Sequence, residues 1–370
     1  MRVARVVLGV VTLALGVSAC SDTRSMSSST PAPQASAPSP SASTQAAAAR
    51  FLARYVTSDG RVIRHDQGGD IVSEGQAYAM LLAELARRGP LVRTIWSWTS
   101  AHLRRGDGLF AWHANGDGQL LNEQSASDAD ILIAYALLRY RGADQAKLND
   151  AGRAVAQAVL ANESVTQPDG APLVVAGPWA KLTSRPIVDP SYLMPSIFVA
   201  LGRLTGDQRW SRAAAAAITT IAELTDGGRR LPPDWARLSR GRLVPIAEPG
   251  GAAGVQYGFD AARLPVWFAT ACESSARALA AGWWRNVLGT GGRSGPQALG
   301  LSGNTIDPVS SPLPLVAGAA AAAAAGDAAA ASDLRKRAGE LSLRTPTYYG
   351  DAWVALGPAL LERSIDPCAE

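Results

Sequence analysis

A long succession of helical segments is the feature that most constrains the fold of this chain. From Gln45 to the C-terminus, apolar residues recur at helical spacing, and no convincing run of alternating strand residues interrupts them. About twelve helices are predicted, at 45–56, 73–88, 91–105, 127–141, 144–163, 190–205, 207–225, 259–272, 273–288, 308–325, 328–343 and 347–363. This pattern predicts an all-α fold in one domain, and an even helix number fits a closed double ring, six inside six.

Composition excludes a nucleic-acid-binding role. The chain has 370 residues with 47% hydrophobic content, enough for a substantial core. Its formal charge of +4 falls to +2 when Arg2 and Arg5 are removed with the leader segment described next. No stripe of Lys or Arg appears in the sequence, so no nucleic-acid partner is expected.

The first 20 residues are predicted to be a targeting segment. Arg2 and Arg5 form a basic start, and the apolar run from Val6 to Val17 is too short to span a bilayer comfortably. The segment ends in Val-Ser-Ala-Cys at 17–20, which resembles the lipobox of bacterial lipoproteins. That resemblance implies cleavage before Cys20 and a lipid on its sulfur. Ordinary secretion with an incidental Cys20 is the alternative, and both predict an extracytoplasmic protein.

Residues 21–49 are predicted to be a flexible tether. They contain four prolines and no aromatic residue, and Ser, Ala and Thr make up most of the rest. Such a segment cannot bury enough apolar surface to fold. The folded domain is therefore predicted to span residues 50–370, and a monomer is expected.

Glu74 lies in the first chemically informative stretch, Ser-Glu-Gly-Gln-Ala-Tyr at 73–78. Ser73 followed by Gln76 is typical of a capping box, which would place Glu74 in the first turn of a helix. There the helix dipole stabilises an ionised carboxylate. A surface acid that only complements the dipole is the alternative interpretation.

Two further stretches carry acids at predicted helix starts. Ser127 and Asp130 have the spacing of an N-cap signature, and Asp128 adds a second carboxylate two residues before Asp130. Capping would explain one of these acids more readily than both. Asp260 also opens a predicted helix, with Arg263 one turn later and close enough to orient its carboxylate, unless the two are an exposed capping pair.

Together these stretches resemble the motifs of family-8 glycoside hydrolases. They are Ser-Glu-Gly-Gln-x-Tyr at 73–78, Ala-Ser-Asp-Ala-Asp at 126–130 and Phe-Asp-Ala-x-Arg at 259–263. Gly-Pro-Trp at 177–179 and Pro-Ser-Tyr-Leu-Met-Pro at 190–195 match further stretches of the family. The resemblance spans about residues 50–363. The Asp-Ala-Asp form, and Val266-Trp267 after Arg263, look more like the endoglucanases that accompany bacterial cellulose synthase than like cellulosome enzymes.

The resemblance implies an (α/α)6 barrel and inverting hydrolysis of a β-1,4-glucan, mainly of the cellulose type. Such hydrolysis needs one protonated carboxylic acid at the leaving oxygen and one carboxylate that activates water. Glu74 is the expected acid and Asp260 the expected base, with Arg263 holding Asp260. Asp128 is expected at the cleft centre, where it would raise the pKa of Glu74. It is also a rival candidate for the nucleophile or base, and Asp130 is expected to grip a sugar ring.

Aromatic residues in motif or loop positions are candidates for stacking on sugar rings. They are Trp112, Trp179 and Tyr192. Phe259 is a departure, because relatives usually have Tyr there and a hydroxyl contact beside the expected base is missing. This change could alter subsite binding.

Metal and cofactor sites are not expected. His65, His102 and His113 lack metal-ligand spacing, and the calcium-like stretch from His113 has Gln124 where the loop needs Glu. Cys272 and Cys368 could pair outside the cytoplasm or remain a buried thiol and a frayed tail.

Two classes of function remain open at this point. One is an extracytoplasmic, lipid-anchored endo-β-1,4-glucanase, or a relative acting on chitosan, xylan or mixed-linkage glucan. The other is a catalytically silent glycan-binding lipoprotein on the same barrel. The presence of Glu74, Asp128, Asp130 and Asp260 together favours the enzyme.

Overall fold

The computed structural model describes residues 38–181, 184–290 and 295–369. The predicted leader, Cys20 and most of the predicted tether lie outside the described residues. Within the described residues, no helix is long and apolar enough to cross a membrane.

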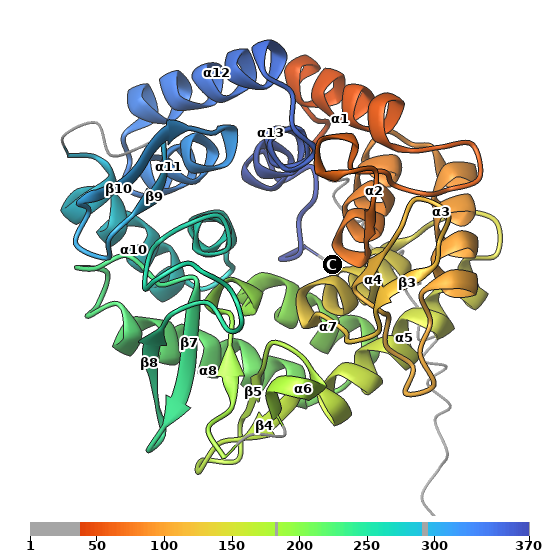
Figure 1. Cartoon of the computed structure of the whole chain (residues 1–370), viewed down its shortest axis with the longest axis horizontal. Helices are drawn as coiled ribbons and strands as arrows, with labels where there is room; N and C mark the ends of the chain where they lie inside the picture. The colour runs from red at the N-terminus through yellow and green to blue at the C-terminus, as the bar shows by residue number, and fades with distance from the viewer. Residues whose placement is uncertain (1–37, 182–183, 291–294, 370) are drawn as a thin grey trace, which may run out of the picture. The chain divides into compact units, whose positions relative to one another are not determined.

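Among the described residues, twelve helices alternate along the chain between an outer and an inner layer (Figure 1). The outer layer consists of α1 (Ala42–Tyr55), α3 (Gly89–His102), α5 (Gln145–Asn162), α8 (Gln208–Leu224), α10 (Ser274–Trp283) and α12 (Ala328–Arg344). The inner layer consists of α2 (Ser73–Leu85), α4 (Ser127–Arg139), α7 (Pro195–Thr205), α9 (Leu264–Ala269), α11 (Pro312–Ala324) and α13 (Tyr348–Leu361). A thirteenth helix, the single turn α6 (Pro178–Lys181), lies in a loop.

The inner helices form a closed ring. Each contacts the next in the order α2, α4, α7, α9, α11 and α13, and α13 returns to α2. Helices enclosed in this way need no polar face, and nearly every residue of α4 and α11 is buried. The alanine run from Ala319 to Ala324 suits α11, because alanine has the highest helix propensity and allows close packing. The predicted (α/α)6 barrel is therefore confirmed.

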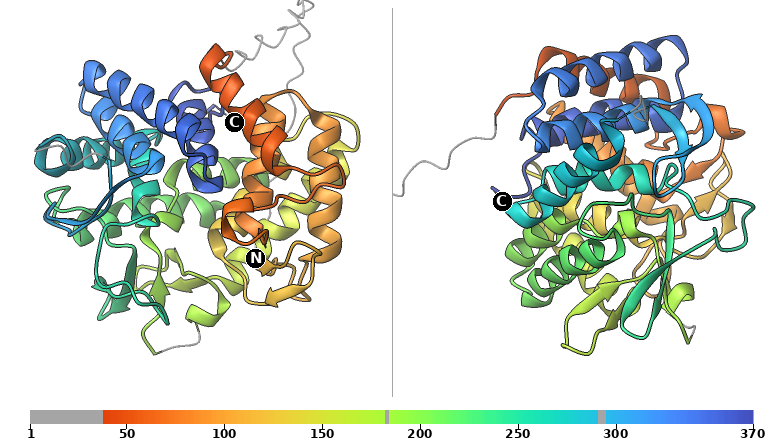
Figure 2. Two further views of the ribbon diagram at one scale, coloured as in Figure 1. Left: turned by 45° about the horizontal axis from the view of Figure 1, so that its top comes forward. Right: turned by 90° about the vertical axis from the view of Figure 1, so that its left-hand side faces the viewer.

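In the part of the chain that the structure describes, ten short strands lie in the loops between helices, mostly at one end of the barrel (Figure 2). All their pairings are antiparallel. They are β1 (Ile71–Val72), β2 (His113–Ala114), β3 (Leu120–Asn122), β4 (Ser164–Thr166), β5 (Pro172–Val174), β6 (Ile187–Val188), β7 (Trp235–Ser239), β8 (Arg242–Ile246), β9 (Pro296–Leu299) and β10 (Thr305–Ser310). The sequence did not predict them, since none exceeds six residues and such short strands leave little alternation.

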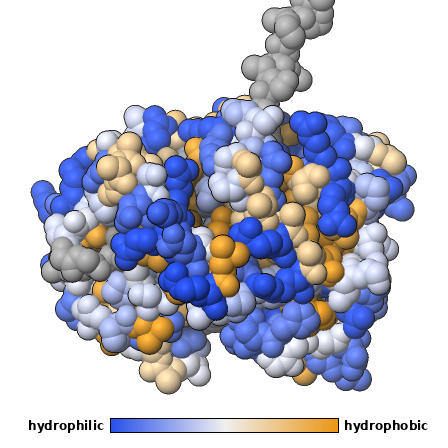
Figure 3. All heavy atoms as spheres, turned by 90° about the horizontal axis from the view of Figure 1, so that it is seen from above, coloured by the Kyte–Doolittle hydropathy of each residue, from blue (hydrophilic) through white to orange (hydrophobic). Residues whose placement is uncertain are grey.

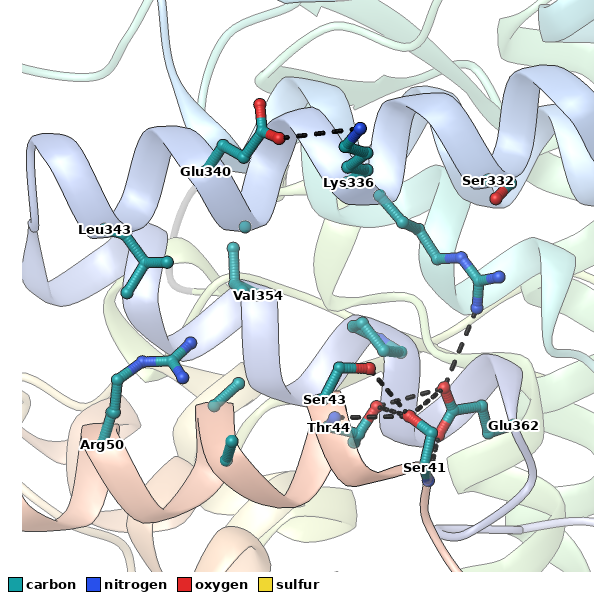
Figure 4. A pocket seen from close by; sticks show the side chains of 15 residues that line it. Ser41, Ser43, Thr44, Arg50, Ser332, Lys336, Glu340, Leu343, Val354 and Glu362 are labelled. Carbon is teal, nitrogen blue, oxygen red and sulfur yellow. Dashed lines mark hydrogen bonds and ion pairs between the residues drawn. The ribbon is translucent and has the colours of Figure 1, made fainter.

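The first helix, α1, packs against the last inner helix, α13. Glu362, just after α13, accepts hydrogen bonds from the Ser41 backbone N–H at 3.0 Å and hydroxyl at 2.9 Å, and from Thr44 Oγ1 at 3.1 Å. A groove of about 550 Å³ lies between α1 and α12 (Figure 4). Figure 3 views the molecule from this side, where hydrophilic surface is interrupted by apolar patches.

Three local expectations differ from the structure. α1 begins at Ala42 with Ala47 and Ala48 buried, so the folded part starts before residue 50. The predicted capping box at α2 is wrong, because Gln76 is buried and bonds Val62, Gly60 and Thr99. The predicted cap at α4 is also wrong, because the Ser127 hydroxyl donates instead to the Val175 carbonyl at 2.7 Å.

The C-terminal tail is covalently attached to the barrel. A disulfide joins Cys272, between α9 and α10, to Cys368, after α13. The two cysteines are therefore paired in the structure, which is one of the two alternatives that the sequence left open.

Candidate active site

The N-terminal ends of the inner helices converge at one end of the barrel and bring distant acids together. Glu74 lies in the first turn of α2 and Asp128 in the first turn of α4. Asp189 lies in the segment before α7, and Asp260 with Arg263 immediately before α9. The partial positive charge at each helix N-terminus favours carboxylates there.

Arg263 is the centre of this cluster. Its side chain is only 3% exposed, and the guanidinium contacts four carboxyl groups. Nη1 lies 2.6 Å from Asp128 Oδ2 and 3.6 Å from Glu74 Oε2. Nη2 lies 3.1 Å from Asp260 Oδ1 and 3.2 Å from Asp189 Oδ2. The expected contact between Arg263 and Asp260 is present, and three further acids share the same cation.

Glu74 has the environment of a carboxylic acid that keeps its proton near neutrality. Burial raises its pKa to about 7, and the charge of Asp128 acts in the same direction. Arg263 and Arg64 oppose the rise. The side chain is still 21% exposed, so the carboxyl group is recessed in the cleft and accessible from it.

Asp260 has a similarly raised pKa but a more open position. Burial of its carboxyl group raises the pKa to about 7, Arg263 opposes the rise, and Asp234 and Asp128 reinforce it. The side chain is 37% exposed. One guanidinium contacts both Asp260 and Glu74. Their carboxyl groups are therefore no further apart than the upper end of the roughly 6.5–9.5 Å that separates the two acids of an inverting enzyme.

Asp130 does not face the cleft, contrary to the expectation that it grips a sugar. Its side chain is completely buried, and Oδ1 accepts a hydrogen bond from the Phe110 backbone N–H at 3.0 Å. The buried carboxyl group of Glu163 lies close enough for its charge to raise the pKa of Asp130. The position on the helix explains the difference, because two residues further along corresponds to about 200° around the helix axis, which is nearly the opposite side. Asp128 and Asp130 therefore point to different surroundings.

A cleft of about 760 Å³ extends from Glu74 and Asp260, and its walls are rich in aromatic and polar groups. Tyr348 and Tyr349, at the start of α13, line it together with Phe259, whose ring meets that of Tyr349 edge-on at 5.9 Å. A cleft of this size and composition suits a small segment of a polar polymer.

The three predicted sugar-stacking residues occupy different places. Tyr192 is 9% exposed and lies under the Arg263 guanidinium, 5.1 Å from ring centroid to Cζ, so it belongs to the cluster. Trp112 is half-buried beside the acid, since its carbonyl accepts a hydrogen bond from the Ser73 N–H at 3.0 Å. Trp179 is half-buried in α6, 6.4 Å from the ring of Trp235.

Several site residues were not predicted from the sequence. Asp189 binds Arg263, Arg64 lines the cleft next to Glu74, and Asp234 binds the loop that carries Asp260. Asp189 directly precedes the Pro-Ser-Tyr motif, which is the signal that could have identified it. Among the described residues, no group of three or more His, Cys, Asp or Glu is arranged to hold a metal ion.

Six inner helices with acids gathered around one arginine at their N-terminal ends define an (α/α)6-barrel protein with a candidate acid/base site. The chain belongs to the glycosyl hydrolases family 8, whose family model matches residues 26–352. It is 32% identical over 231 residues to a probable endoglucanase from Novacetimonas hansenii and 28% identical over 228 residues to an endoglucanase from Cellulomonas uda.

These two alignments each cover 60% of this chain, and 65% and 62% of the respective relatives, so the chain spans less than two thirds of their length. Among solved structures, endoglucanase Cel10 from Klebsiella pneumoniae is 25% identical with a TM-score of 0.71, covering 86% of this chain and 99% of that one. A β-1,3-1,4-glucanase from Paenibacillus sp. X4 has a TM-score of 0.75 at 20% identity, covering 89% and 96%, which shows a common fold alone.

Proposed function

We propose that this protein is an exported, lipid-anchored endo-β-1,4-glucanase that cleaves a cellulose-type glucan with inversion at the anomeric carbon. The observation that carries the proposal is the four-carboxylate cluster around Arg263, in which Glu74 and Asp260 both reach the cleft with raised pKa values. Family membership and the endoglucanase names of the relatives support the reaction class.

Glu74 acts as the general acid in this mechanism. Its protonated carboxyl group donates a proton to the glycosidic oxygen as the bond to the anomeric carbon breaks. Water attacks that carbon from the opposite face, and Asp260 takes the proton that the water loses. Asp128, between them on Arg263, contributes negative charge that keeps the proton on Glu74 and stabilises positive charge developing on the sugar.

The pH dependence follows from these roles. Asp260 must be ionised, so activity falls as the pH drops through its pKa. Glu74 must be protonated, so activity falls as the pH rises through its pKa. Because both pKa values lie at about 7, a narrow bell-shaped profile near neutrality is expected.

Export and anchoring rest on residues 1–20 and on the disulfide. A Cys272–Cys368 bridge suits an oxidising compartment outside the cytoplasm. Replacing Cys20 by serine should move the protein from the membrane fraction to the soluble exported fraction. Unchanged membrane association of the Cys20→Ser variant would contradict the anchor.

Product stereochemistry tests the mechanism. NMR of the first product, taken before mutarotation, should show the α-anomer when a β-1,4-glucan is cleaved. A nucleophilic carboxylate such as Asp128 would give the β-anomer instead, and that result would contradict the proposed base. Carboxymethylcellulose, chitosan, xylan and mixed-linkage glucan compared side by side identify the substrate. No release of reducing ends from any of them would favour the glycan-binding alternative.

A further inference from the structure

Asp234 is a buried acid that the proposed mechanism does not use. It follows Pro232 and Pro233, immediately precedes β7, and is 7% exposed. Its Oδ1 accepts hydrogen bonds from the backbone N–H groups of Gly258 and Ala261, both at 2.8 Å.

The other polar atoms of Asp234 hold the same loop. Its Oδ2 accepts a hydrogen bond from Gln256 Nε2 at 3.1 Å, and its backbone N–H donates to the Gln256 carbonyl at 2.8 Å. Four hydrogen bonds therefore connect Asp234 with residues 256–261, the loop that carries Asp260. Asp260 itself makes no capping bond there, so its position depends on the backbone that Asp234 holds.

Gly258 makes the close approach possible. A Cβ atom at this position would lie 2.4 Å from Asp234 Oδ2, which is closer than any real side chain tolerates. The neighbouring Tyr257 pairs with Leu299, its N–H donating to the Leu299 carbonyl at 2.7 Å and its carbonyl accepting at 2.9 Å. The loop is thus fixed from two sides, by β9 and by Asp234.

Asp234 also presents charge to Asp260. Burial raises the pKa of Asp234, and the hydrogen bonds that its carboxylate accepts from Ala261, Gly258 and Gln256 oppose the rise. Burial raises the pKa of Asp260 and Arg263 lowers it, and the negative charge of Asp234 adds to the rise. The titratable or charged groups that face Asp260 are Arg263, Asp234, Asp128, Glu248, Asp189, Glu74, Tyr192 and Tyr349.

We propose that Asp234 is a positioning residue, which holds the backbone that places Asp260 and presents a negative charge to its carboxylate. The inference rests on the proposed role of Asp260 as the base. A base works best when its own proton affinity matches the working pH, and a nearby negative charge increases that affinity. Asp234 would thus set both where the base stands and at which pH it ionises.

Asp234→Asn separates charge from position. The amide keeps an oxygen for the two N–H groups, and the Gln256 amide can rotate to accept from the new NH₂ group. We expect kcat at the pH optimum to be retained, while the acidic limb of the kcat/KM profile moves about 0.5–1 pH unit lower. Asp150→Asn makes the same change in net charge at an exposed position on α5 and should leave the limb in place.

Asp234→Ala and Gly258→Ala test the positioning. Both should lower kcat by at least about tenfold with a smaller change in KM, because a displaced base is felt in the chemical step. Circular dichroism checks that each variant is folded. An unmoved acidic limb in Asp234→Asn, or an unchanged kcat in a folded Asp234→Ala, would overturn the proposal.

Asp260→Asn distinguishes failure of this inference from failure of the proposed function. If Asp260→Asn is inactive but Asp234→Asn leaves the profile unmoved, the base assignment stands and the role of Asp234 is rejected. If Asp260→Asn keeps near-normal activity, Asp260 is not the base, and the role given to Asp234 is rejected together with it.

Discussion

Two sets of carboxyl groups include neighbouring residues of α4, Asp128 and Asp130, and differ in what compensates their charge. The first set, Asp128 with Glu74, Asp189 and Asp260, surrounds the guanidinium of Arg263 within 3.6 Å. The second is the pair Asp130–Glu163. Among the ion pairs of the described residues, none reaches this pair.

The Asp130–Glu163 pair is held by neutral donors. Asp130 Oδ1 accepts from the Phe110 N–H at 3.0 Å and Glu163 Oε1 from the Ser125 hydroxyl at 2.7 Å. The charge of Glu163 also raises the pKa of Asp130, so the environment favours a proton on at least one of the two carboxyl groups. Burial raises the pKa of Glu163 to about 8 and that of Asp130 well above its usual range.

The comparison shows that the presence or absence of a neighbouring cation decides whether a recessed carboxyl group can ionise. Around Arg263, carboxylates can ionise and still remain buried, which acid/base chemistry requires. In the Asp130–Glu163 pair, a proton replaces the cation, so the pair contributes to structure and not to proton transfer with a substrate. Loss of the cation is expected to have the largest effect, followed by loss of single acids, loss of the proton on Glu163 and loss of the Ser125 hydroxyl.

Removal of the cation should have the largest effect. Arg263→Met would leave four carboxyl groups without their common partner, at a cost of about 3–5 kcal/mol in the free energy of unfolding and with loss of activity. Urea unfolding should show partial recovery of stability at acidic pH, where those carboxyl groups become neutral. Arg263→Lys keeps the charge but not the planar fork, and is expected to fold with greatly reduced activity. Wild-type turnover in Arg263→Lys would contradict the importance of the fork.

Removal of single acids should distinguish the two sets by activity. Glu74→Gln and Asp260→Asn should each lower kcat by at least about a hundredfold, because an amide can neither donate nor accept the proton. Asp130→Asn, the matched change in the pair, should lower kcat by far less. Reducing-end release from the identified substrate measures all three. Near-normal activity in Glu74→Gln would end its assignment as the acid.

Replacement of Glu163, which carries the extra proton of the pair, should change the pH dependence of stability. Glu163 has a raised pKa in the folded protein. Its favourable contribution to the free energy of unfolding is therefore complete below pH 4.5, its ordinary pKa, and is lost as the pH rises through about 8. Glu163→Gln should therefore flatten the decline in the free energy of unfolding between pH 5 and pH 9, by roughly a few kcal/mol at most. Urea unfolding at several pH values measures this change.

Glu340→Gln is the control for that experiment. Glu340 is an exposed acid on α12 that pairs with Lys336 at 4.0 Å, so its replacement makes the same change in charge without removing a buried group. The slope of stability against pH should stay as in the wild type. A Glu163→Gln variant with the wild-type slope would show that the pair does not hold the extra proton.

The fold could be predicted from the sequence because the inner helices are apolar and periodic over whole turns. The predicted segment 127–141 became α4, and 328–343 became α12. Helix caps could not be predicted, since the polar side chains of Gln76 and Ser127 bond groups that lie elsewhere in the fold. Local cap signatures do not reveal such competition from tertiary contacts.

The site was predictable only where acids stand inside motifs. Glu74, Asp128, Asp260 and Arg263 come together in the structure as the resemblance implied. Glu163 lies outside the motifs, and its importance arises from its contact with Ser125, 38 residues earlier. Asp189 directly precedes one motif, but its contact with Arg263, 74 residues later, could not be predicted from that position. A single sequence contains no record of such contacts, and the different surroundings of Asp130 depend on them.

The smallest predicted effect tests whether the neutral donors of the pair matter. Ser125→Ala removes the hydroxyl that donates to Glu163 Oε1 and should lower the free energy of unfolding by about 1 kcal/mol at neutral pH. That hydrogen bond lowers the pKa of Glu163, so the variant should keep its proton to higher pH. Stability should therefore decline with pH over a wider range than in the wild type. Activity should be nearly unchanged, because Ser125 lies on the pair and not on Arg263. If Ser125→Ala instead reduces kcat as strongly as Asp260→Asn, the two carboxylate sets act as one, and the distinction drawn between them is wrong.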